Sequence, residues 1–314
     1  MGAVETLVLP FGSRALVTGS TISRAGSAFG FVTEILRGRL CAERLTAGPC
    51  SVDIDLDAGG RLSSLRVHGL ELLEQRTDTN HPFGWGSFVM VPFAGRIRNG
   101  LFCFDGESHT MPANMGPHAI HGTSFDQPWE LLAGATDWAL LGTRIGGERT
   151  PPWPFAATVT HLISLSSSGL TQVLGVIPTN TAMPVTFGWH PWFRRRLTHG
   201  GPLQLAADMS KASRLLRDDD WISTAKLVEP GPRPWDDCFV DVGSIVLRWP
   251  NALEVEVHHD APFVVIYDPT HAICVEPQSG PPNAFSLDAE GSRLEAGELA
   301  ELTVSWRWTM ASRP

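Results

Sequence analysis

Apolar and polar residues alternate in most segments after residue 50, with the two-residue period of strands that bury one face. In residues 51–69, Val52, Ile54 and Leu56 alternate with aspartates, and a Gly-Gly turn leads into a second alternating run. Because successive side chains of a strand point to opposite faces, these residues predict a half-buried hairpin.

The same period recurs further along the chain. Residues 157–178 predict a second hairpin, residues 251–269 predict two consecutive strands, and residues 299–310 predict a closing strand. No helical period extends over three turns after residue 50. Many short strands separated by glycines and prolines predict an all-β fold, a β-sandwich or a barrel, for residues 49–311.

Residues 1–48 lack this regular alternation. Their apolar residues follow no consistent period and isolated arginines interrupt them. We therefore expect a loosely ordered N-terminal extension before the β domain.

The composition restricts the class of protein. Hydrophobic residues make up 43% of the 314 residues, enough for a sizeable core, and the net charge of −9 argues against a phosphate-binding surface. The five cysteines include no C-x-x-C pair, and the chain shows neither a long apolar span nor a secretory signal. We expect a cytoplasmic protein, monomeric or homodimeric, with no nucleic-acid partner and no membrane association.

One histidine lies in a markedly apolar run. His190 stands in the stretch TFGWHPWFR between Trp189 and Trp192, and three arginines follow at 194–196. The ring is either packed in a core or held partly dry for proton exchange, and the run itself leaves both readings open. On a strand Trp189 and His190 point to opposite faces, so at most one of the two tryptophans lines a site with the histidine. The arginines read as a solvated strand end rather than as a phosphate site.

A glutamate stands at the end of another apolar strand. In ICVEPQSGPPNAF, Glu276 precedes Pro277 and a loop rich in proline and glycine. Burial there would raise the pKa of the carboxyl group towards the range of a general base. A surface glutamate at a turn is the equally simple alternative.

Three further segments place polar residues in bends rich in glycine and proline. They contain Arg96 in VPFAGRIRNG, His121 in GPHAIHGTSF, and the pair Asp236 and Asp237 in GPRPWDDCFV. Each residue taken alone reads as an ordinary surface or turn residue.

The histidine spacings do not predict a metal site. His118 and His121 are three residues apart in a loop and not on a helix, and His258 and His259 are neighbours on a predicted strand, where they point to opposite faces.

Taken in order, these segments resemble the aldose 1-epimerase (galactose mutarotase-like) family. The resemblance covers residues 51–307 and rests on GRIRNGLFCFDGESHTMPANMGPHAIHG, FGWHPWF, WDDCF and VEPQSGPPNAF. These are similar to the family's N-R-I to H-G-G stretch, its G-x-H-x-Y-F, its F-D-x-x-F and its E-P-Q-T-x-x-P-N-A-F. The resemblance implies a large antiparallel β-sandwich, a supersandwich, with a sugar site on its concave face.

The resemblance also implies roles by position. Glu276 matches the family's general base and His190 its general acid. The strand pattern leaves open whether Asp236 or Asp237 faces the site, although Asp236 is the positional match. The implied sugar-binding residues are Arg96, His121, Asp236 and Trp192.

The implied function is an aldose 1-epimerase, or mutarotase, that interconverts the α and β anomers of a free hexose by acid–base ring opening and reclosure. Such a reaction needs two proton-transfer groups and neither a metal nor another cofactor. We expect a glutamate whose pKa is raised by burial and a histidine near its ordinary pKa.

Three departures from the family pattern leave the preferred sugar open. Gly95 replaces an asparagine, Thr123 a glycine and Trp192 a tyrosine. The alternatives are a hexose-6-phosphate mutarotase, a non-catalytic carbohydrate-binding protein with the same fold, and a lyase or hydrolase on the same type of sandwich.

Overall fold

The computed structural model describes residues 5–8, 14–17, 44–78, 81–147 and 153–311, and the chain divides into two units, Met1–Cys41 and Ala42–Pro314. In the first unit, β1 (Glu5–Val8) pairs antiparallel with β2 (Arg14–Val17). Most of the predicted N-terminal extension lies outside the described residues, so its loose order stays a prediction. The second unit begins its first strand at Arg44, within residues 1–48.

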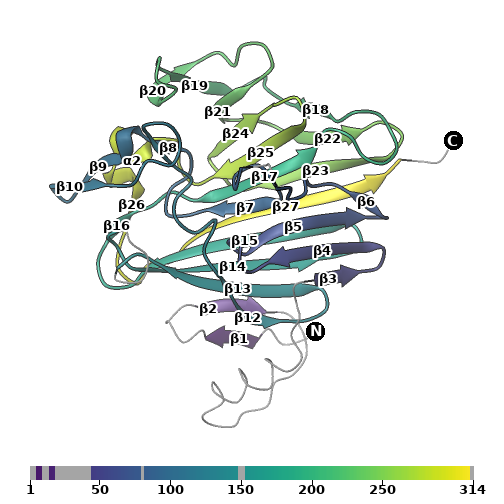
Figure 1. Ribbon diagram of the computed structural model, residues 1–314, viewed down its shortest axis with the longest axis horizontal. Coiled ribbons are helices and arrows are strands. Elements are labelled where there is room, and N and C mark those ends of the chain that lie inside the picture. Colours follow the sequence, from purple (N-terminus) through teal and green to yellow (C-terminus); the bar gives the residue numbers. More distant parts are fainter. Residues whose placement is uncertain (1–4, 9–13, 18–43, 79–80, 148–152, 312–314) are drawn as a thin grey trace, which may run out of the picture. The chain divides into compact units, whose positions relative to one another are not determined.

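The second unit contains two large antiparallel sheets (Figure 1). One sheet has eight strands, in the spatial order β12 (Glu130–Gly134), β13 (Trp138–Ile145), β14 (Ala157–Leu165), β15 (Gly169–Pro178), β27 (Ala300–Met310), β23 (Leu253–His259), β22 (Ile245–Trp249) and β18 (Gln204–Ala207). The other is an eleven-stranded sheet, in the order β20 (Ser223–Val228), β19 (Ser213–Arg217), β21 (Asp236–Val240), β24 (Phe263–Tyr267), β25 (Ala272–Gln278), β17 (Gly188–Arg194), β7 (Ser87–Met90), β5 (Arg61–Val67), β4 (Cys50–Asp55) and β3 (Arg44–Ala47), with β6 (Leu70–Glu71) also paired to β5.

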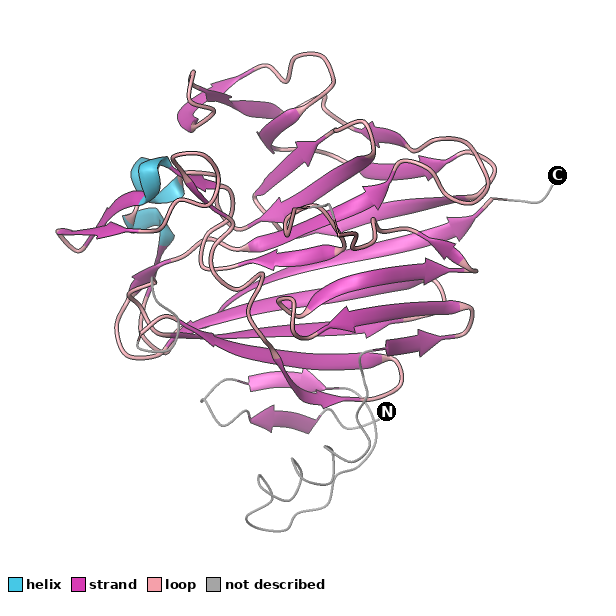
Figure 2. Ribbon diagram, viewed as in Figure 1, coloured by secondary structure: helices cyan, strands magenta, loops and turns pink. Residues whose placement is uncertain are grey.

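Short elements connect these strands. Three two-stranded ribbons are β8 (Arg96–Ile97) with β11 (Ala119–Ile120), β9 (Leu101–Phe104) with β10 (Glu107–Thr110), and β16 (Met183–Pro184) with β26 (Arg293–Leu294). Helical structure in the described residues is limited to η1 (Arg98–Gly100), α2 (Ala284–Leu287) and η2 (Glu290–Ser292), as Figure 2 shows. No helix in the described part of the chain is long and apolar enough to cross a membrane.

The alternating sequence pattern correctly predicted the strands. The two predicted hairpins are β4–β5 and β14–β15, residues 251–269 form β23 and β24, and residues 299–310 end in β27. In β4 the alternation matches burial, since Val52 and Ile54 are buried while Asp53 and Asp55 are half-buried.

The two sheets pack face to face around one apolar core. The core contains residues of both sheets, and the rings of Phe193 on β17 and Trp306 on β27 lie 4.9 Å apart between them. Among the described strands, the outermost ones are β20 and β3 in one sheet and β12 and β18 in the other, and neither outer pair joins to close its sheet. The predicted all-β fold is therefore a sandwich and not a closed barrel.

The eleven-stranded sheet buries side chains on both of its faces. A second apolar cluster, which includes Phe88, Met90, Trp192 and Cys274, covers the face that points away from the sandwich core. All seven residues of β25 are buried as a result. A strand buried on both faces shows a continuous apolar run, as the AICV that precedes Glu276 does.

A small polar network is enclosed in the core between the sheets. Trp189 on β17 donates its indole N–H to Nε2 of His161 on β14, over 3.2 Å, and Gln172 on β15 lies 3.2 Å from the same nitrogen. His161 is fully buried, and its burial lowers the pKa of the imidazole to about 4. Protonating this ring therefore opposes the folded state.

This burial makes stability depend on pH. The unfolded chain binds a proton at His161 below about pH 6.5, but the folded chain does so only near pH 4, so stability is lost as pH falls through this range. We expect His161→Gln to remove about 3 kcal/mol of that acid destabilisation, measured by urea unfolding at a series of pH values. Thr158→Val, on the same strand, should shift the unfolding free energy equally at every pH. A wild-type pH dependence in His161→Gln would contradict the assignment.

Candidate active site

The candidate site is built on neighbouring strands of the eleven-stranded sheet, β7, β17 and β25 (Figure 1). β17 pairs with β25 in a register that sets Trp192 opposite Cys274. Counting two residues back on β17 and two forward on β25 sets His190 opposite Glu276. On the other side of β17, Phe88 of β7 lies opposite His190. One row of side chains across the sheet therefore contains both predicted proton-transfer residues.

The two predicted residues are in direct contact. His190 Nε2 lies 3.2 Å from Glu276 Oε1, and the side chains are 6% and 2% exposed. Gln278, two residues further on the same face of β25, donates its amide to the other carboxyl oxygen over 3.2 Å. The carboxyl group thus has one oxygen held by an amide and the other directed at an imidazole.

Aromatic rings fix the imidazole of His190. Phe88 stacks on it at 4.9 Å between ring centroids, and Trp192 stacks on it at 5.2 Å with an interplanar angle of 10°. Trp189 points to the opposite face, where it donates to His161. The prediction that at most one tryptophan of the run shares the face of His190 is confirmed, and that residue is Trp192.

Burial controls the charge of this pair. It raises the pKa of Glu276 well above the ordinary range, and the charge of Asp236 adds to that rise, while the Gln278 amide and the Arg96 charge oppose it. Burial, together with the charge of Arg61, lowers the pKa of His190 to about 3. The expectation of a histidine near its ordinary pKa is wrong, because the ring is almost completely desolvated. Burial thus favours the neutral form of both side chains, a protonated Glu276 and an unprotonated His190.

His121 reaches the pair from a separate segment. Its ring lies 5.1 Å from that of His190 in an edge-to-face arrangement. His121 adopts the left-handed conformation, with φ 62°, and its amide donates to the carbonyl of Gly95. A Cβ at the next residue, Gly122, would lie 2.0 Å from the carbonyl oxygen of Val91. Only glycine allows the backbones to meet here, which explains the His-Gly sequence physically.

Arg96 lies beside the same carboxyl group. It begins β8, which pairs with β11 just before His121, and its side chain is half-buried. Burial lowers the pKa of its guanidinium, while the charges of Asp236 and Glu276 raise it. Arg96 is therefore a cation among the carboxylates of the site, with several N–H donors in reach of a ligand.

The strand register decides between the two aspartates. Asp236 of β21 lies opposite Tyr267 of β24, which lies opposite Cys274 of β25. These residues share the face of Glu276, because Cys274 and Glu276 are two apart on one strand. Asp237, the next residue on β21, points to the opposite face of the sheet. Asp236 accepts a hydrogen bond from Arg217 over 3.0 Å and is the aspartate on the side of the site.

Trp192 contacts the site with its edge. The imidazole of His190, two residues earlier on β17, stacks on the indole at 5.2 Å between ring centroids. The imidazole of His271, which directly precedes β25, stacks on it at 5.4 Å. The indole faces are thus covered. The edge of the indole, with its Nε1–H that has no partner within the described residues, is the part of Trp192 left to contact a ligand.

Several buried polar atoms around the pair have no hydrogen-bond partner within the described residues. They are His121 Nδ1, His190 Nδ1, Trp192 Nε1 and Gln278 Oε1. Unpaired polar atoms are rare in protein interiors. These four atoms lie around the acid–base pair and are therefore available to hydrogen-bond a ligand.

Sequence reasoning missed Gln278, Phe88 and Tyr267. Gln278 could have been found, since it lies two residues after Glu276 on a predicted strand. Phe88 and Tyr267 come from strands whose pairing with β17 and β25 has no local signal. Tyr267 is the chain's single tyrosine, and burial together with the Asp236 charge raises its pKa.

Donor types that bind metal ions also meet here. One donor atom each of His190, Cys274 and Glu276 lies within 4.8 Å of the others, in the part of the chain that the structure describes. Two of these donors, Glu276 Oε1 and His190 Nε2, are the atoms that contact each other at 3.2 Å.

Comparison with known proteins identifies the same family as the sequence motifs do. The family model for aldose 1-epimerase matches residues 45–307. The uncharacterized protein YihR of Escherichia coli (strain K12) is 22% identical over 288 residues, which is 81% of this chain and 89% of YihR.

Solved structures share the fold. A galactose mutarotase-like protein from Clostridium acetobutylicum superimposes with a TM-score of 0.75 at 18% identity, covering 85% of this chain and 95% of that one. A galactose 1-epimerase from Lactobacillus acidophilus NCFM gives a TM-score of 0.67 at 17% identity, covering 85% and 93%.

The role of Gln278 can be tested without any substrate. Its amide stabilises the charged form of Glu276, so Gln278→Leu should raise the pKa of that carboxyl group further. The measurement is the carboxyl-carbon NMR signal of Glu276, assigned with Glu276→Gln. Gln172→Leu, which changes a buried glutamine of the other sheet, should leave the signal unmoved. An unchanged or lowered pKa in Gln278→Leu would show that the amide does not act on the carboxylate.

Proposed function

The chain belongs to the aldose 1-epimerase family, and we propose on this basis that it interconverts the α and β anomers of a free hexose. The observation that carries the proposal is the buried contact of 3.2 Å between His190 Nε2 and Glu276 Oε1. In a cyclic aldose, the hydroxyl oxygen O1 and the ring oxygen O5 are bonded to the same carbon. Two groups that lie as close together as these two can therefore reach both oxygens of one sugar.

The reaction moves two protons and leaves the total unchanged. In ring opening, O1 loses its proton to one group, the C1–O5 bond breaks, and O5 receives a proton from the other group. Rotation about C1–C2 exposes the other face of the aldehyde, and O5 then attacks C1 while the two protons return. A pair that holds one proton can complete this cycle without exchange with solvent.

The two distributions of that proton correspond to the two halves of the reaction. Ring opening requires Glu276 as carboxylate and His190 as imidazolium, and it ends with the proton on Glu276. Ring closure begins from that second state, which is the one that burial favours in the sugar-free protein. Gln278 and Arg96 favour the carboxylate and therefore promote the first state. These two neighbours therefore act against the effect of burial.

The remaining residues would hold the sugar. Arg96, His121 and Trp192 provide polar atoms on the face of the acid–base pair, and Asp236 provides a carboxylate that accepts from hydroxyl groups. The unpaired nitrogens of His121 and Trp192 support this role, because a bound sugar would satisfy them.

A free hexose fits the surrounding charges better than a phosphorylated one. Arg195, in the arginine run, donates to Asp268 and to the carbonyls of Pro269 and Ala272, so it fastens the end of β17. Arg217 is bonded to Asp236. Arg195 and Arg217 are thus already paired within the protein, which leaves Arg96 as the cation of the site with donors in reach of a ligand.

Replacing either member of the pair should abolish most of the catalysis. Glu276→Gln and His190→Asn each remove one proton-transfer group, which typically contributes 10²–10⁴-fold, so we expect kcat to fall by about that factor. The assay is polarimetry of freshly dissolved α-glucose or α-galactose. Glu256→Gln, on the exposed side of β23, should retain the wild-type rate.

Calorimetry of sugar binding distinguishes a variant that has lost catalysis from one that no longer binds the sugar. His190→Asn should still bind sugar, because its other contacts remain. A wild-type rate in Glu276→Gln would refute the mechanism. Sugar binding by a wild-type protein that gives no rate enhancement would instead support a non-catalytic carbohydrate-binding role.

The preference for an uncharged sugar can be measured directly. We expect kcat/KM for α-glucose to exceed that for glucose 6-phosphate, because Arg195 and Arg217 are already paired. Raising the salt concentration should change the rate with glucose little, since no charge is being attracted. A higher kcat/KM for the phosphorylated sugar, falling with salt, would assign the protein to hexose-6-phosphate mutarotation.

A further inference from the structure

Arg61 lies in the same cross-strand row as the acid–base pair. Leu62 of β5 lies opposite Ser87 of β7, which sets Arg61 opposite Phe88, and Phe88 lies opposite His190. The row across the sheet is therefore Arg61, Phe88, His190 and Glu276. A cation stands two strands from the imidazole, on the same face of the sheet.

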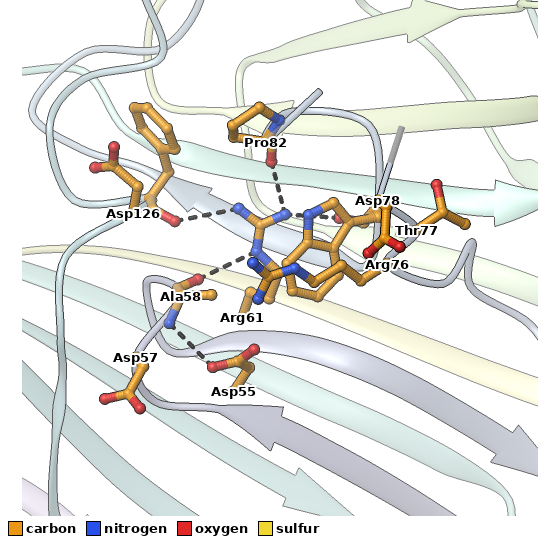
Figure 3. A pocket seen from close by; sticks show the side chains of 11 residues that line it. Asp55, Asp57, Ala58, Arg61, Arg76, Thr77, Asp78, Pro82 and Asp126 are labelled. Carbon is orange, nitrogen blue, oxygen red and sulfur yellow. Dashed lines mark hydrogen bonds between the residues drawn. The ribbon is translucent and has the colours of Figure 1, made fainter. Parts of the chain in front are cut away.

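The guanidinium of Arg61 is buried and held by backbone carbonyls. The residue is 1% exposed. Figure 3 shows its guanidinium group beside Ala58 and Pro82. Its hydrogen bonds, of 2.8–3.1 Å, go to the carbonyl oxygens of Ala58, Pro82, Trp85 and Phe125. A buried cation held in this way by three separate segments ties those segments together.

The segments tied by Arg61 form the aromatic wall of the site. Phe83, between the bonded carbonyls of Pro82 and Trp85, lies 5.3 Å from the ring of His121 and 4.6 Å from Phe125. Arg61 also lies 5.0 Å from the centre of the Phe88 ring, which itself stacks on His190 at 4.9 Å. The position of both histidines thus depends on groups that Arg61 fastens.

A cavity opens on the other side of this arginine. It has a volume of about 590 Å³, and its lining includes Asp55, Arg76 and Asp126 besides Arg61 (Figure 3). The charges of Asp55 and Asp126 act on Arg61 from there, while its hydrogen bonds point to the carbonyls. Arg61 therefore lines this cavity and is connected to His190 through the ring of Phe88.

The charge of Arg61 also reaches His190. The guanidinium carbon and the imidazole are at most about 10 Å apart, since each lies about 5 Å from the Phe88 ring. The other titratable and charged groups that surround the imidazole are Glu276 and Cys274 of β25, His121 after β11, and Arg96 of β8. After burial, the charge of Arg61 is the largest cause that lowers the pKa of His190.

We propose that Arg61 is a positioning residue of the acid–base pair. It holds the Phe88 ring against which His190 is stacked and places a fixed positive charge behind the imidazole. The inference rests on the proposed epimerase function. Because Arg61 lies behind the wall of the site, it does not touch the sugar. Losing it should therefore impair turnover more than substrate binding.

The test compares two replacements at this position. Arg61→Lys keeps the charge but loses the planar fork that bonds the carbonyls, whereas Arg61→Met loses both. We expect kcat of both variants to fall about 10–100-fold with KM nearly unchanged, because the pair is misplaced. Arg76→Met removes the other arginine of the same cavity, which lies over the Trp85 ring, and should keep the wild-type kcat.

The pH profile separates the charge from simple packing. Without the cation, the pKa of His190 should rise from about 3 by about one unit. Near pH 4 the pair in Arg61→Met would then take up a second proton, so its kcat/KM should fall relative to its own value at neutral pH. The wild type and Arg61→Lys should each keep their own neutral-pH value there. Circular dichroism at the same pH shows that each protein remains folded. A profile for Arg61→Met that matches the wild type, or a change confined to KM, would overturn the proposal.

Two provisions keep the test decisive. If Arg61→Met does not fold, Arg61→Gln, which has amide donors but no charge, carries the same expectation. NMR titration of the His190 ring, assigned with His190→Asn, needs no substrate. It measures directly the coupling between Arg61 and His190, which is the effect of the Arg61 charge on the pKa of the imidazole. If the wild type shows no epimerase activity but the titration shifts as expected, the proposed function fails and the coupling stands. If the wild type is active and the titration does not shift, the role of Arg61 fails alone.

Discussion

The contact between His190 and Glu276 exists because β17 and β25 pair in one register. A slip of one residue would turn either side chain to the opposite face of the sheet. The opposite face prevents such a slip, since Trp189, Phe193 and Val275 are packed there in the sandwich core. The packing energy of the core is thus what aligns two residues that are 86 positions apart in the chain. Everything proposed for the chemistry depends on that alignment.

Burial on both faces of this sheet then determines the electrostatics. The same apolar surroundings that order the pair disfavour charge on either member, which raises the pKa of one and lowers that of the other. Polar and charged neighbours oppose or add to these pKa shifts. Gln278 stabilises the carboxylate, and Arg61 disfavours the imidazolium. A group on the same strand and a group two strands away thus modify the pKa values that burial sets for this pair.

Two residues of the site, His121 and Arg96, come from short irregular segments and not from the strands of the large sheet. His121 arrives on a left-handed residue, followed by a glycine that contacts the carbonyl of Val91 with no room for a Cβ. Arg96 arrives on a two-residue strand paired beside it. These short segments place a second imidazole and a guanidinium over the face of the pair. Gly122 thus has a steric reason that is separate from the chemistry of the site.

The sequence alone determined the local features of this protein. Alternation located the hairpins β4–β5 and β14–β15 and showed that Trp192, not Trp189, could share a face with His190. Motif order further identified the family and the candidate residues. These features were readable because side-chain direction along a strand depends only on the residues of that strand.

Only the tertiary structure decided which strands lie next to one another. The choice of Asp236 over Asp237, the stacking of Phe88, the place of Tyr267 and the row that begins at Arg61 all follow from strand pairing across long stretches of chain. The low pKa of His190 follows from desolvation by residues of several strands. A periodic pattern reports the two faces of a strand but neither its partner, its register, nor how much water is left around a side chain.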